Sequence, residues 1–409
     1  MNYSFVKVTS FYRDYLDQYY SKNPQIVKTD YMKQYQHLMY DSFGWADFFQ
    51  QNLSLIGIKA YEIVYNAKPL QQVWALENST ELRGKELIIF QLKLLKPDIV
   101  FFQDTINFNG EWIEYLKNKV PSIKKVIGWC CHPFTLKQIE MFRHFDFMVT
   151  CSPLFSQIFN ENGLKTYVMP HAFEPKILER IKSNTNNKKD ITFIGSLIPN
   201  ADFHDYRIST IEELLYSNIN LSVNTNLINI STPMVVSQKI FYFLTKRLLK
   251  SGYKGKILKI PMIKKMIPLK EAPKKPKYSD RLVKSADEPS YGLEMYNIIN
   301  NSRINLNIHG GIAGEYAANM RMFESTGVAT CLVTDWKKNL DEFFIEDEEI
   351  ITFKSSEECI EKVKWLLNNP NEIEKISLAG QKRTLNDHNF KVRAEQLNEI
   401  IRNELEYLK

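Results

Sequence analysis

Short apolar runs alternate with amphipathic segments along residues 1–170, and this alternation predicts a repeating strand–helix fold. The expected strands are short and almost wholly apolar, as in parallel sheets that are covered on both faces. They span residues 4–8, 59–65, 98–103, 125–131, 147–151 and 166–169. Helical spacing is found at residues 47–55, 81–95, 111–120 and 153–162. The pattern therefore predicts an α/β protein with a doubly wound parallel sheet.

A second strand–helix series follows a polar stretch that runs from Lys182 to Lys189. Its first strand, Ile191–Ile194, leads into Gly195 and Ser196, and its helix is expected over residues 208–216. Later strands are expected at residues 303–308, 328–335 and 350–353. We therefore predict a first Rossmann-like domain at 1–175, a linker at 176–190, a second Rossmann-like domain at 191–390 and a C-terminal helix at 391–409.

Residues 225–280 break the alternation and form an expected basic insertion in the second domain. Residues 235–249 have the spacing of an amphipathic helix, and a proline-interrupted basic tract follows them. The tract contains Lys254, Lys256, Lys259, Lys264, Lys265, Lys270, Lys274, Lys275 and Lys277. One interpretation is a solvated surface insertion. The other is a patch within 235–277 that contacts an anionic membrane surface.

The segment from His309 to Gly327 carries the most specific chemistry. A strand runs into a turn with three glycines, and we expect that turn to open a helix with Glu324 about two turns in. Glycines allow close approach of a ligand to the backbone, and the start of a helix offers N–H groups to a diphosphate. Glu324 is placed to accept hydrogen bonds from a ribose diol. The pattern indicates a sugar-nucleotide site, with an ordinary strand–helix loop as the alternative.

This segment resembles the donor-binding half of GT-B glycosyltransferases, in the branch that includes spore-maturation (CgeB-like) proteins with a family 1/4-type donor domain. The similarity continues through residues 328–335, 339–344, 350–353, 356–358, 380–384 and 388–390, and more faintly to the N-terminus. It implies that the C-terminal helix packs back toward the first domain. Related retaining enzymes carry Glu-x7-Glu with the second glutamate at Glu324. The first falls on Tyr316, one residue beyond Glu315.

The pattern and the resemblance together predict a donor-binding set. It consists of Gly195, Ser196, Arg207, His309, Gly310, Gly311, Gly314, Glu315, Asn319, Arg321 and Glu324. Cations and helix starts must offset the charge of a departing diphosphate where no metal does so. No Asp-x-Asp pair stands where a metal-dependent transferase needs one, so we expect no metal site. Arg207 has the alternative of a surface arginine, and Asn319 that of a helix cap.

Besides Glu324, which the resemblance also makes a candidate catalytic residue, two residues of the first domain are candidates for catalysis. His132 follows the strand at 125–131 and Asp104 follows the strand at 98–103, so both lie at the edge where open α/β sheets bind ligands. If the enzyme inverts, Asp104 is the first candidate for the general base. The alternatives are a structural histidine and a turn aspartate. We expect His171 to pack at the interdomain crossover, and Phe43–Trp45 to line the acceptor side.

Composition narrows the class of protein further. The 409 residues carry a formal net charge of +6 with 44% hydrophobic residues, which suits a globular protein of two domains and is too mild for nucleic-acid binding. Five cysteines show no metal or disulfide spacing, so we expect buried free thiols, Cys130 and Cys131 among them. With no signal peptide or bilayer-spanning run, the expected location is the cytoplasm, with peripheral attachment to the inner membrane face as the alternative.

The resemblance implies a bacterial hexosyltransferase or related transferase of polysaccharide biosynthesis. Its donor would be a UDP-, GDP- or TDP-linked sugar, and no other cofactor is expected. The acceptor would be a glycan, a lipid-linked saccharide or a protein. The alternatives are a sugar-nucleotide epimerase on the same fold and a catalytically silent scaffold subunit. A dinucleotide-binding dehydrogenase is disfavoured because no Gly-x-Gly-x-x-Gly follows the early strands.

Overall fold

The computed structural model describes residues 3–108, 110–182, 188–199, 204–227, 232–253, 255–267, 269, 271–275 and 277–406. The chain divides into two compact units. One combines Met1–Phe193 with Ser290–Lys409, and the other is Ile194–Pro289. Part of the predicted linker, residues 183–187, lies outside the described residues, as do Lys254 and Lys270 of the basic tract.

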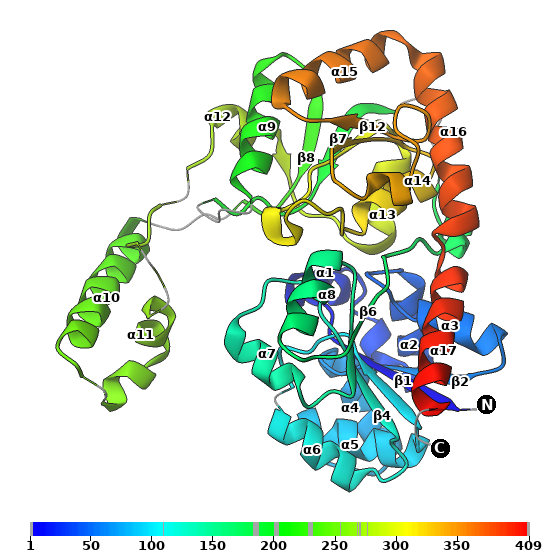
Figure 1. Ribbon diagram of the computed structural model, residues 1–409, viewed down its shortest axis with the longest axis vertical. Helices are drawn as coiled ribbons and strands as arrows, with labels where there is room; N and C mark the ends of the chain where they lie inside the picture. The colour runs from blue at the N-terminus through cyan, green and yellow to red at the C-terminus, as the bar shows by residue number, and fades with distance from the viewer. Residues whose placement is uncertain are drawn as a thin grey trace. The chain divides into compact units, whose positions relative to one another are not determined.

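The first sheet has six strands in the order β2-β1-β3-β4-β5-β6, and all neighbours are parallel (Figure 1). Every side chain of β3 is buried, because the sheet is covered on both faces. The strands are β1 (Ser4–Thr9), β2 (Lys59–Val64), β3 (Ile99–Phe102), β4 (Lys125–Trp129), β5 (Phe147–Thr150) and β6 (Thr166–Val168). All six strands predicted for residues 1–170 are confirmed.

Helices cover this sheet. They are α1 (Arg13–Lys22), α2 (Tyr31–Tyr40), α3 (Phe48–Leu55), α4 (Lys68–Glu77), α5 (Gly84–Leu95), α6 (Gly110–Lys119), α7 (Leu136–Phe142) and α8 (Pro153–Glu161). The four helices predicted from spacing are confirmed as α3, α5, α6 and α8. Helices α1, α2, α4 and α7 were not predicted, although Thr135 and Gln138 form a capping box at the start of α7.

The second sheet has the order β12-β11-β10-β7-β8-β9. Its strands are β7 (Lys189–Ile194), β8 (Leu221–Asn224), β9 (Ala286–Asp287), β10 (Ser302–Asn307), β11 (Cys331–Asp335) and β12 (Ile351–Phe353). Its helices include α9 (Asp205–Tyr216), α12 (Asp280–Ser285), α13 (Gly292–Asn300), α14 (Arg321–Gly327), α15 (Ser356–Asn368) and α16 (Pro370–Asp387). The expectation of a second series of parallel strands and helices is confirmed.

The chain passes between the two sheets in two segments that are bonded to each other. Phe173 and Asn389 form an isolated parallel bridge. The Phe173 N–H donates to the His388 carbonyl oxygen at 2.9 Å, and the Phe390 N–H donates to the Phe173 carbonyl oxygen at 3.0 Å. Beyond this bridge, α17 (Phe390–Glu406) packs its first ring against Phe48 of α3, with 4.9 Å between ring centroids.

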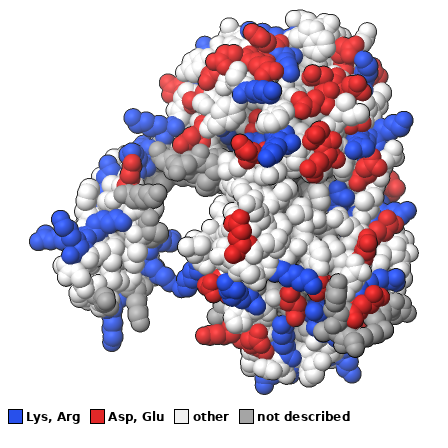
Figure 2. All heavy atoms as spheres, in the orientation of Figure 1, with Lys and Arg blue, Asp and Glu red and all other residues white. Residues whose placement is uncertain are grey.

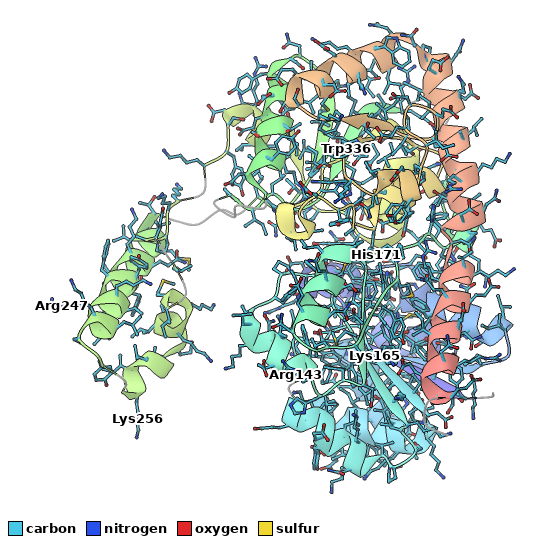
Figure 3. All side chains as sticks on the ribbon, in the orientation of Figure 1. Arg143, Lys165, His171, Arg247, Lys256 and Trp336 are labelled. Atoms are coloured by element: carbon cyan, nitrogen blue, oxygen red, sulfur yellow. A yellow bond between two sulfur atoms is a disulfide. The ribbon has the colours of Figure 1, made fainter. Side chains whose placement is uncertain are left out.

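The basic insertion contains a helical hairpin of α10 (Thr232–Lys250) and α11 (Pro261–Met266). The predicted helix at 235–249 is therefore confirmed. Figure 2 shows Lys and Arg side chains around an uncharged surface on this hairpin, and Figure 3 shows Arg247 and Lys256 projecting outward from it. One side of α10 exposes large apolar side chains: Val236 is 51% exposed, Ile240 62% and Phe243 62%.

A buried ion pair joins the first two strands of the first sheet. Lys7 of β1 lies 3.2 Å from the Glu62 carboxylate of β2, and both side chains are fully buried. Burial raises the pKa of Glu62 to about 8 even though the Lys7 charge favours ionisation. The Lys7 ammonium also donates to the Ala46 carbonyl at 3.0 Å and to Gln103 at 3.2 Å. Lys7 thereby fixes the side chain of Gln103, the residue before Asp104.

Replacing Lys7 with Met should destabilise the protein by about 2–4 kcal/mol at pH 7, because Glu62 is left buried without a partner. Folded Glu62 must then keep a proton that the unfolded chain releases above about pH 4.3, so the stability loss should grow as pH rises. Urea unfolding of Lys7→Met at pH 5 and pH 7 measures this. The double variant Lys7→Met/Glu62→Leu should lose the extra pH dependence; if it keeps that dependence, Glu62 is not its source.

Candidate functional site

A glycine-rich loop joins β10 to α14 and carries most of the predicted donor-binding residues. Gly311–Ala313 forms a single 3-10 turn, and Gly314 has φ of +60° and ψ of −121°, a conformation that side chains disfavour. The helix itself begins only at Arg321. The expectation that the glycine turn opens the helix is therefore wrong, and Glu324 lies in the first helical turn instead of two turns in. Asn319 does not cap this helix, because the N-cap position is Met320.

Glu324 is buried and paired, with 5% of its surface exposed. One carboxylate oxygen lies 2.8 Å from the Arg321 guanidinium, and the other accepts a 3.3 Å hydrogen bond from the Tyr296 hydroxyl of α13. Arg321 also contacts the Met295 sulfur at 2.9 Å, while its buried Nε has no hydrogen-bond partner. A carboxylate with one weakly held oxygen and an arginine with a spare donor therefore lie side by side.

Tyr12 directly precedes α1 and interacts electrostatically with the Glu324 carboxylate. Surrounding protein and the negative charge of Glu324 both raise the pKa of the Tyr12 hydroxyl. Even so, 70% of its surface is open to solvent. Tyr12 and Glu324, far apart in the sequence, are therefore close enough to interact electrostatically.

His309 and Asp335 form a second pair at the ends of the neighbouring parallel strands β10 and β11. Asp335 accepts from the His309 backbone N–H at 2.7 Å and lies 2.8 Å from its Nδ1. Burial alone would raise the pKa of Asp335, but His309 and Lys337 outweigh it and hold that pKa below its ordinary value. This pairing fixes the imidazole orientation and leaves its buried Nε2 without a hydrogen-bond partner.

Residues around β11 also hold the loop. The Lys337 ammonium donates to the Gly314 carbonyl oxygen at 3.3 Å. The Asn319 amide donates to Asn307 at 2.7 Å, and Asn307 donates to Thr334 at 2.9 Å. The remaining predicted loop residues, Gly310, Gly311 and Glu315, belong to the same segment, and the Glu315 side chain is exposed.

In the first domain, Asp104 accepts hydrogen bonds at the end of β3. Its donors are the Ser10 hydroxyl at 2.6 Å, the Asn107 amide at 2.7 Å and the Tyr65 hydroxyl at 2.8 Å. Burial would raise the pKa of Asp104, but these donors together outweigh burial and lower it. Asp104 is consequently ionised and well satisfied, which makes it a poor proton acceptor.

His132 lies beyond the end of β4 and is partly exposed. Its Nδ1 is 2.9 Å from the Pro133 carbonyl oxygen, so Nδ1 carries the proton that this contact needs. Its Nε2 lies 3.8 Å from the sulfur of Cys130. Cys130 is a buried free thiol, as predicted, and burial raises its pKa to about 12.

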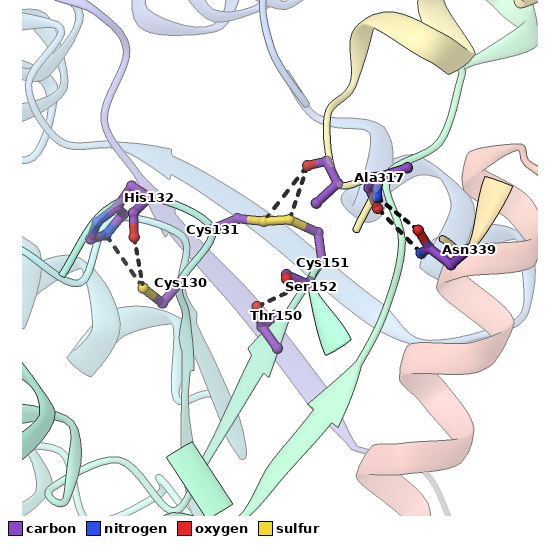
Figure 4. Close-up of a disulfide and its surroundings, with 9 residues drawn as sticks. Cys130, Cys131, His132, Thr150, Cys151, Ser152, Ala317 and Asn339 are labelled. Carbon is purple, nitrogen blue, oxygen red and sulfur yellow. Dashed lines mark hydrogen bonds between the residues drawn. A yellow bond between two sulfur atoms is a disulfide. The ribbon is translucent and has the colours of Figure 1, made fainter. Parts of the chain in front are cut away.

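The expectation of free thiols is wrong for Cys131 and Cys151. Cys131 is paired with Cys151, which follows β5, in a disulfide (Figure 4). The two cysteines are 20 residues apart in sequence, and only the parallel pairing of β4 with β5 brings them together. No local spacing could have indicated the pair. Both sulfurs lie against the Ala318 carbonyl oxygen of the glycine-rich loop, Cys151 at 3.3 Å and Cys131 at 4.0 Å.

His171 and Trp45 lie deep in the first domain. Trp45 is 2% exposed and packs edge-on against Trp129 and the His171 ring, so this part of Phe43–Trp45 belongs to the core. Burial, helped by the Arg393 charge, lowers the pKa of His171 to about 3. The imidazole is therefore neutral at physiological pH.

The remaining predicted residues belong to the second unit. Gly195 and Ser196 directly follow β7, and the Arg207 guanidinium of α9 donates to the Ser196 carbonyl oxygen at 3.0 Å. Arg207 also lies 3.1 Å from His204, whose Nδ1 accepts from the Ile198 N–H at 3.2 Å. Within this unit, Arg207 thus braces the turn that follows β7.

The part of the chain that contains the glycine-rich loop matches a known family. Residues 269–399 match the glycosyl transferase-like family. This match supports the predicted assignment as a glycosyltransferase. No curated protein matches the chain.

Solved structures show the same fold at low sequence identity. A Rickettsia africae glycosyltransferase matches with a TM-score of 0.56 and 10% identity over 99% of both chains. Anabaena Alr3699/HepE, in complex with UDP and glucose, matches with 0.57 and 8% identity over 98% of this chain and 100% of its own. Sucrose-phosphate synthase from Thermosynechococcus elongatus matches with 0.54 and 8% identity over 99% and 100%. The predicted GT-B fold of two Rossmann-like domains is confirmed.

Asp335→Asn should lower the free energy of unfolding by about 1.5–3 kcal/mol at pH 7, the usual contribution of hydrogen bonds to a charged group. The pKa of Asp335 is lowered in the folded protein, so its contribution is complete above the unfolded value of about 3.9 and is lost as pH falls through the folded pKa. The difference in unfolding free energy between the wild type and Asp335→Asn, measured by urea unfolding, should therefore be smaller near pH 3.5 than at pH 7. The exposed Asp341→Asn serves as control; equal loss in both variants would contradict the assignment.

Proposed function

We propose that this protein transfers a sugar from a nucleotide-sugar donor to a glycan, lipid-linked or protein acceptor without a metal ion. The observation that carries the proposal is the buried Glu324–Arg321 pair in the helix after the glycine-rich loop. The weakly held oxygen of Glu324 suits a ribose diol, and the unpartnered Arg321 Nε–H suits an oxygen acceptor. The Nε2 of His309, opposite the Nδ1 that faces Asp335, suits a sugar hydroxyl as donor. These three side chains thus each carry a polar atom that the protein leaves weakly bonded or unbonded.

The donor proposed first is a UDP-linked sugar. The Anabaena structural neighbour has been solved with UDP and with UDP-glucose, which makes UDP the first ligand to test. Arg321 and Lys337 supply positive charge at the loop, in the manner expected of transferases that offset diphosphate charge without a cation.

We assign the catalytic role in the first domain to His132 ahead of Asp104. Asp104 is held ionised by three donors and its pKa is lowered, which opposes a general-base role. His132 is partly exposed, and the proton on Nδ1 leaves Nε2 as its accepting nitrogen. Asp104 then serves to order the edge of the sheet through Ser10, Tyr65 and Asn107.

We also propose that the α10–α11 hairpin contacts an anionic membrane surface. Val236, Ile240 and Phe243 follow i, i+4, i+7 spacing on one exposed side of α10, and Thr232, Pro233, Ser237 and Phe241 complete an open hollow there. Cations flank this side, including Lys239, Arg247 and Lys250. An apolar stripe bordered by cations is the pattern of interfacial helices on anionic lipid. Among the helices that the structure describes, none has the length and apolar character needed to cross a bilayer.

A thermal-shift screen with UDP, GDP, TDP and CMP tests the donor proposal. The preferred nucleotide at about 100 times its dissociation constant should stabilise the protein by roughly 2.7 kcal/mol, equally in EDTA and in magnesium. Glu324→Gln should weaken binding and transfer at least about tenfold, because it removes a charged partner contributing roughly 1.5–3 kcal/mol. The exposed Glu361→Gln on α15 is the matched control. Wild-type affinity in a folded Glu324→Gln protein would refute the site, and turnover without acceptor would indicate an epimerase.

The membrane proposal is tested by sedimentation with anionic vesicles. Ile240→Ser/Phe243→Ser should reduce the bound fraction by removing apolar insertion, and Lys250→Gln/Lys264→Gln/Lys265→Gln by removing cations that contribute about 1 kcal/mol each near the surface. Salt should weaken wild-type binding, since exposed charges are screened beyond roughly 8–10 Å. Lys364→Gln/Lys391→Gln, exposed positions on α15 and α17, should have no effect. A wild-type protein that ignores anionic vesicles at low salt would rule the contact out.

A further inference from the structure

Three residues with metal-binding side chains meet at the carboxyl edge of the first sheet. Cys131 follows β4, Cys151 follows β5 and His171 follows β6, and these three strands are consecutive neighbours in the sheet. Their ligand atoms all lie within 4.8 Å of one another. In the part of the chain that the structure describes, this is the one such group of His, Cys and acidic residues.

The histidine of this cluster has an unused polar atom. His171 is nine-tenths buried, and its Nδ1 has no hydrogen-bond partner. Leaving a buried polar atom unsatisfied costs free energy, so such atoms call for a partner. Figure 3 marks His171, and its ring packs edge-on against both Trp45 and Trp129, which fixes its orientation.

We propose that the Cys131–Cys151–His171 cluster, when reduced, binds one thiophilic divalent cation of the zinc type. Two thiolates and one neutral imidazole are a preferred ligand set for zinc. The fourth ligand would be the Ala318 carbonyl oxygen. It lies 3.3 Å from the Cys151 sulfur and 4.0 Å from the Cys131 sulfur. Neighbouring ligand atoms around tetrahedral zinc are roughly 3.3–3.8 Å apart. To reach that spacing, the two bonded sulfurs must separate, and the 4.0 Å contact between Cys131 and Ala318 must shorten.

The disulfide is the oxidised form of the same cluster. A thiol reductant supplies two electrons and two protons, which converts the disulfide to two thiols while the reductant becomes a disulfide. Binding of the cation then releases the two thiol protons. The cluster contacts the glycine-rich loop through the Ala318 carbonyl oxygen. The disulfide form and the metal-bound form would therefore both contact the loop between β10 and α14. The metal-binding proposal itself does not depend on the proposed donor.

Anaerobic titration of the reduced full-length protein with Co²⁺, followed by competition with Zn²⁺, tests the inference. One equivalent of Co²⁺ should give thiolate-to-cobalt charge-transfer absorption and the visible bands of tetrahedral coordination. His171→Phe keeps both thiols and the aromatic packing but removes a ligand, so it should weaken Co²⁺ binding at least about tenfold. Even the loss of a residue that only supports a ligand typically lowers metal affinity by about that factor. Cys151→Ser should abolish the charge-transfer band. Cys130→Ser removes the adjacent buried thiol outside the cluster and should bind Co²⁺ as the wild type does.

Circular dichroism establishes that each variant is folded, and oxidised wild-type protein should bind no Co²⁺ until it is reduced. The inference is overturned if fully reduced wild-type protein binds no Co²⁺, because the pair is then a disulfide alone. It is equally overturned if folded His171→Phe binds Co²⁺ with wild-type affinity and spectrum. If Cys151→Ser fails to fold, His171→Phe alone decides between these outcomes.

Discussion

Parallel pairing brings the carboxyl ends of all the strands in a sheet to one edge, and almost every polar residue of interest here depends on that constraint. Asp104, Cys131, Cys151 and His171 follow β3, β4, β5 and β6, while His309 follows β10 and Asp335 is the last residue of β11. Strands such as β3 are wholly apolar and buried, so most of these polar groups lie at or just beyond the strand ends. The pairing registers therefore decide which side chains meet.

The strands could be predicted because burial on both faces selects short apolar runs, such as Ile99–Phe102 and Cys331–Asp335. Helices of mixed polarity were harder to see, and α7 needed its capping box to be recognised. Glu324 was correctly singled out as a residue, but its surroundings were not predictable from local spacing. Its partner Tyr296 belongs to α13, and its place in the helix depends on how far the preceding loop extends.

Side-chain pairs between neighbouring strands could not be predicted from the sequence. Lys7 sits in an apolar run, and nothing near it indicates that Glu62 lies opposite. The same holds for Cys131 and Cys151, whose spacing has no meaning until β4 and β5 are paired. Asp335 had a visible signal, because it ends a predicted strand, yet its role depends on β11 lying beside β10. Tertiary neighbours, unlike secondary structure, are set by the order of strands in the sheet.

The two crossings between the sheets have a mechanical consequence. A single flexible connection would let the joined bodies both bend and twist. Here Phe173 and Asn389 lie side by side in a backbone bridge, and the Arg393 guanidinium adds a 2.9 Å hydrogen bond to the Pro170 carbonyl oxygen. Twisting the two segments about each other would break these backbone hydrogen bonds, so the paired connection resists torsion more than a single connection would.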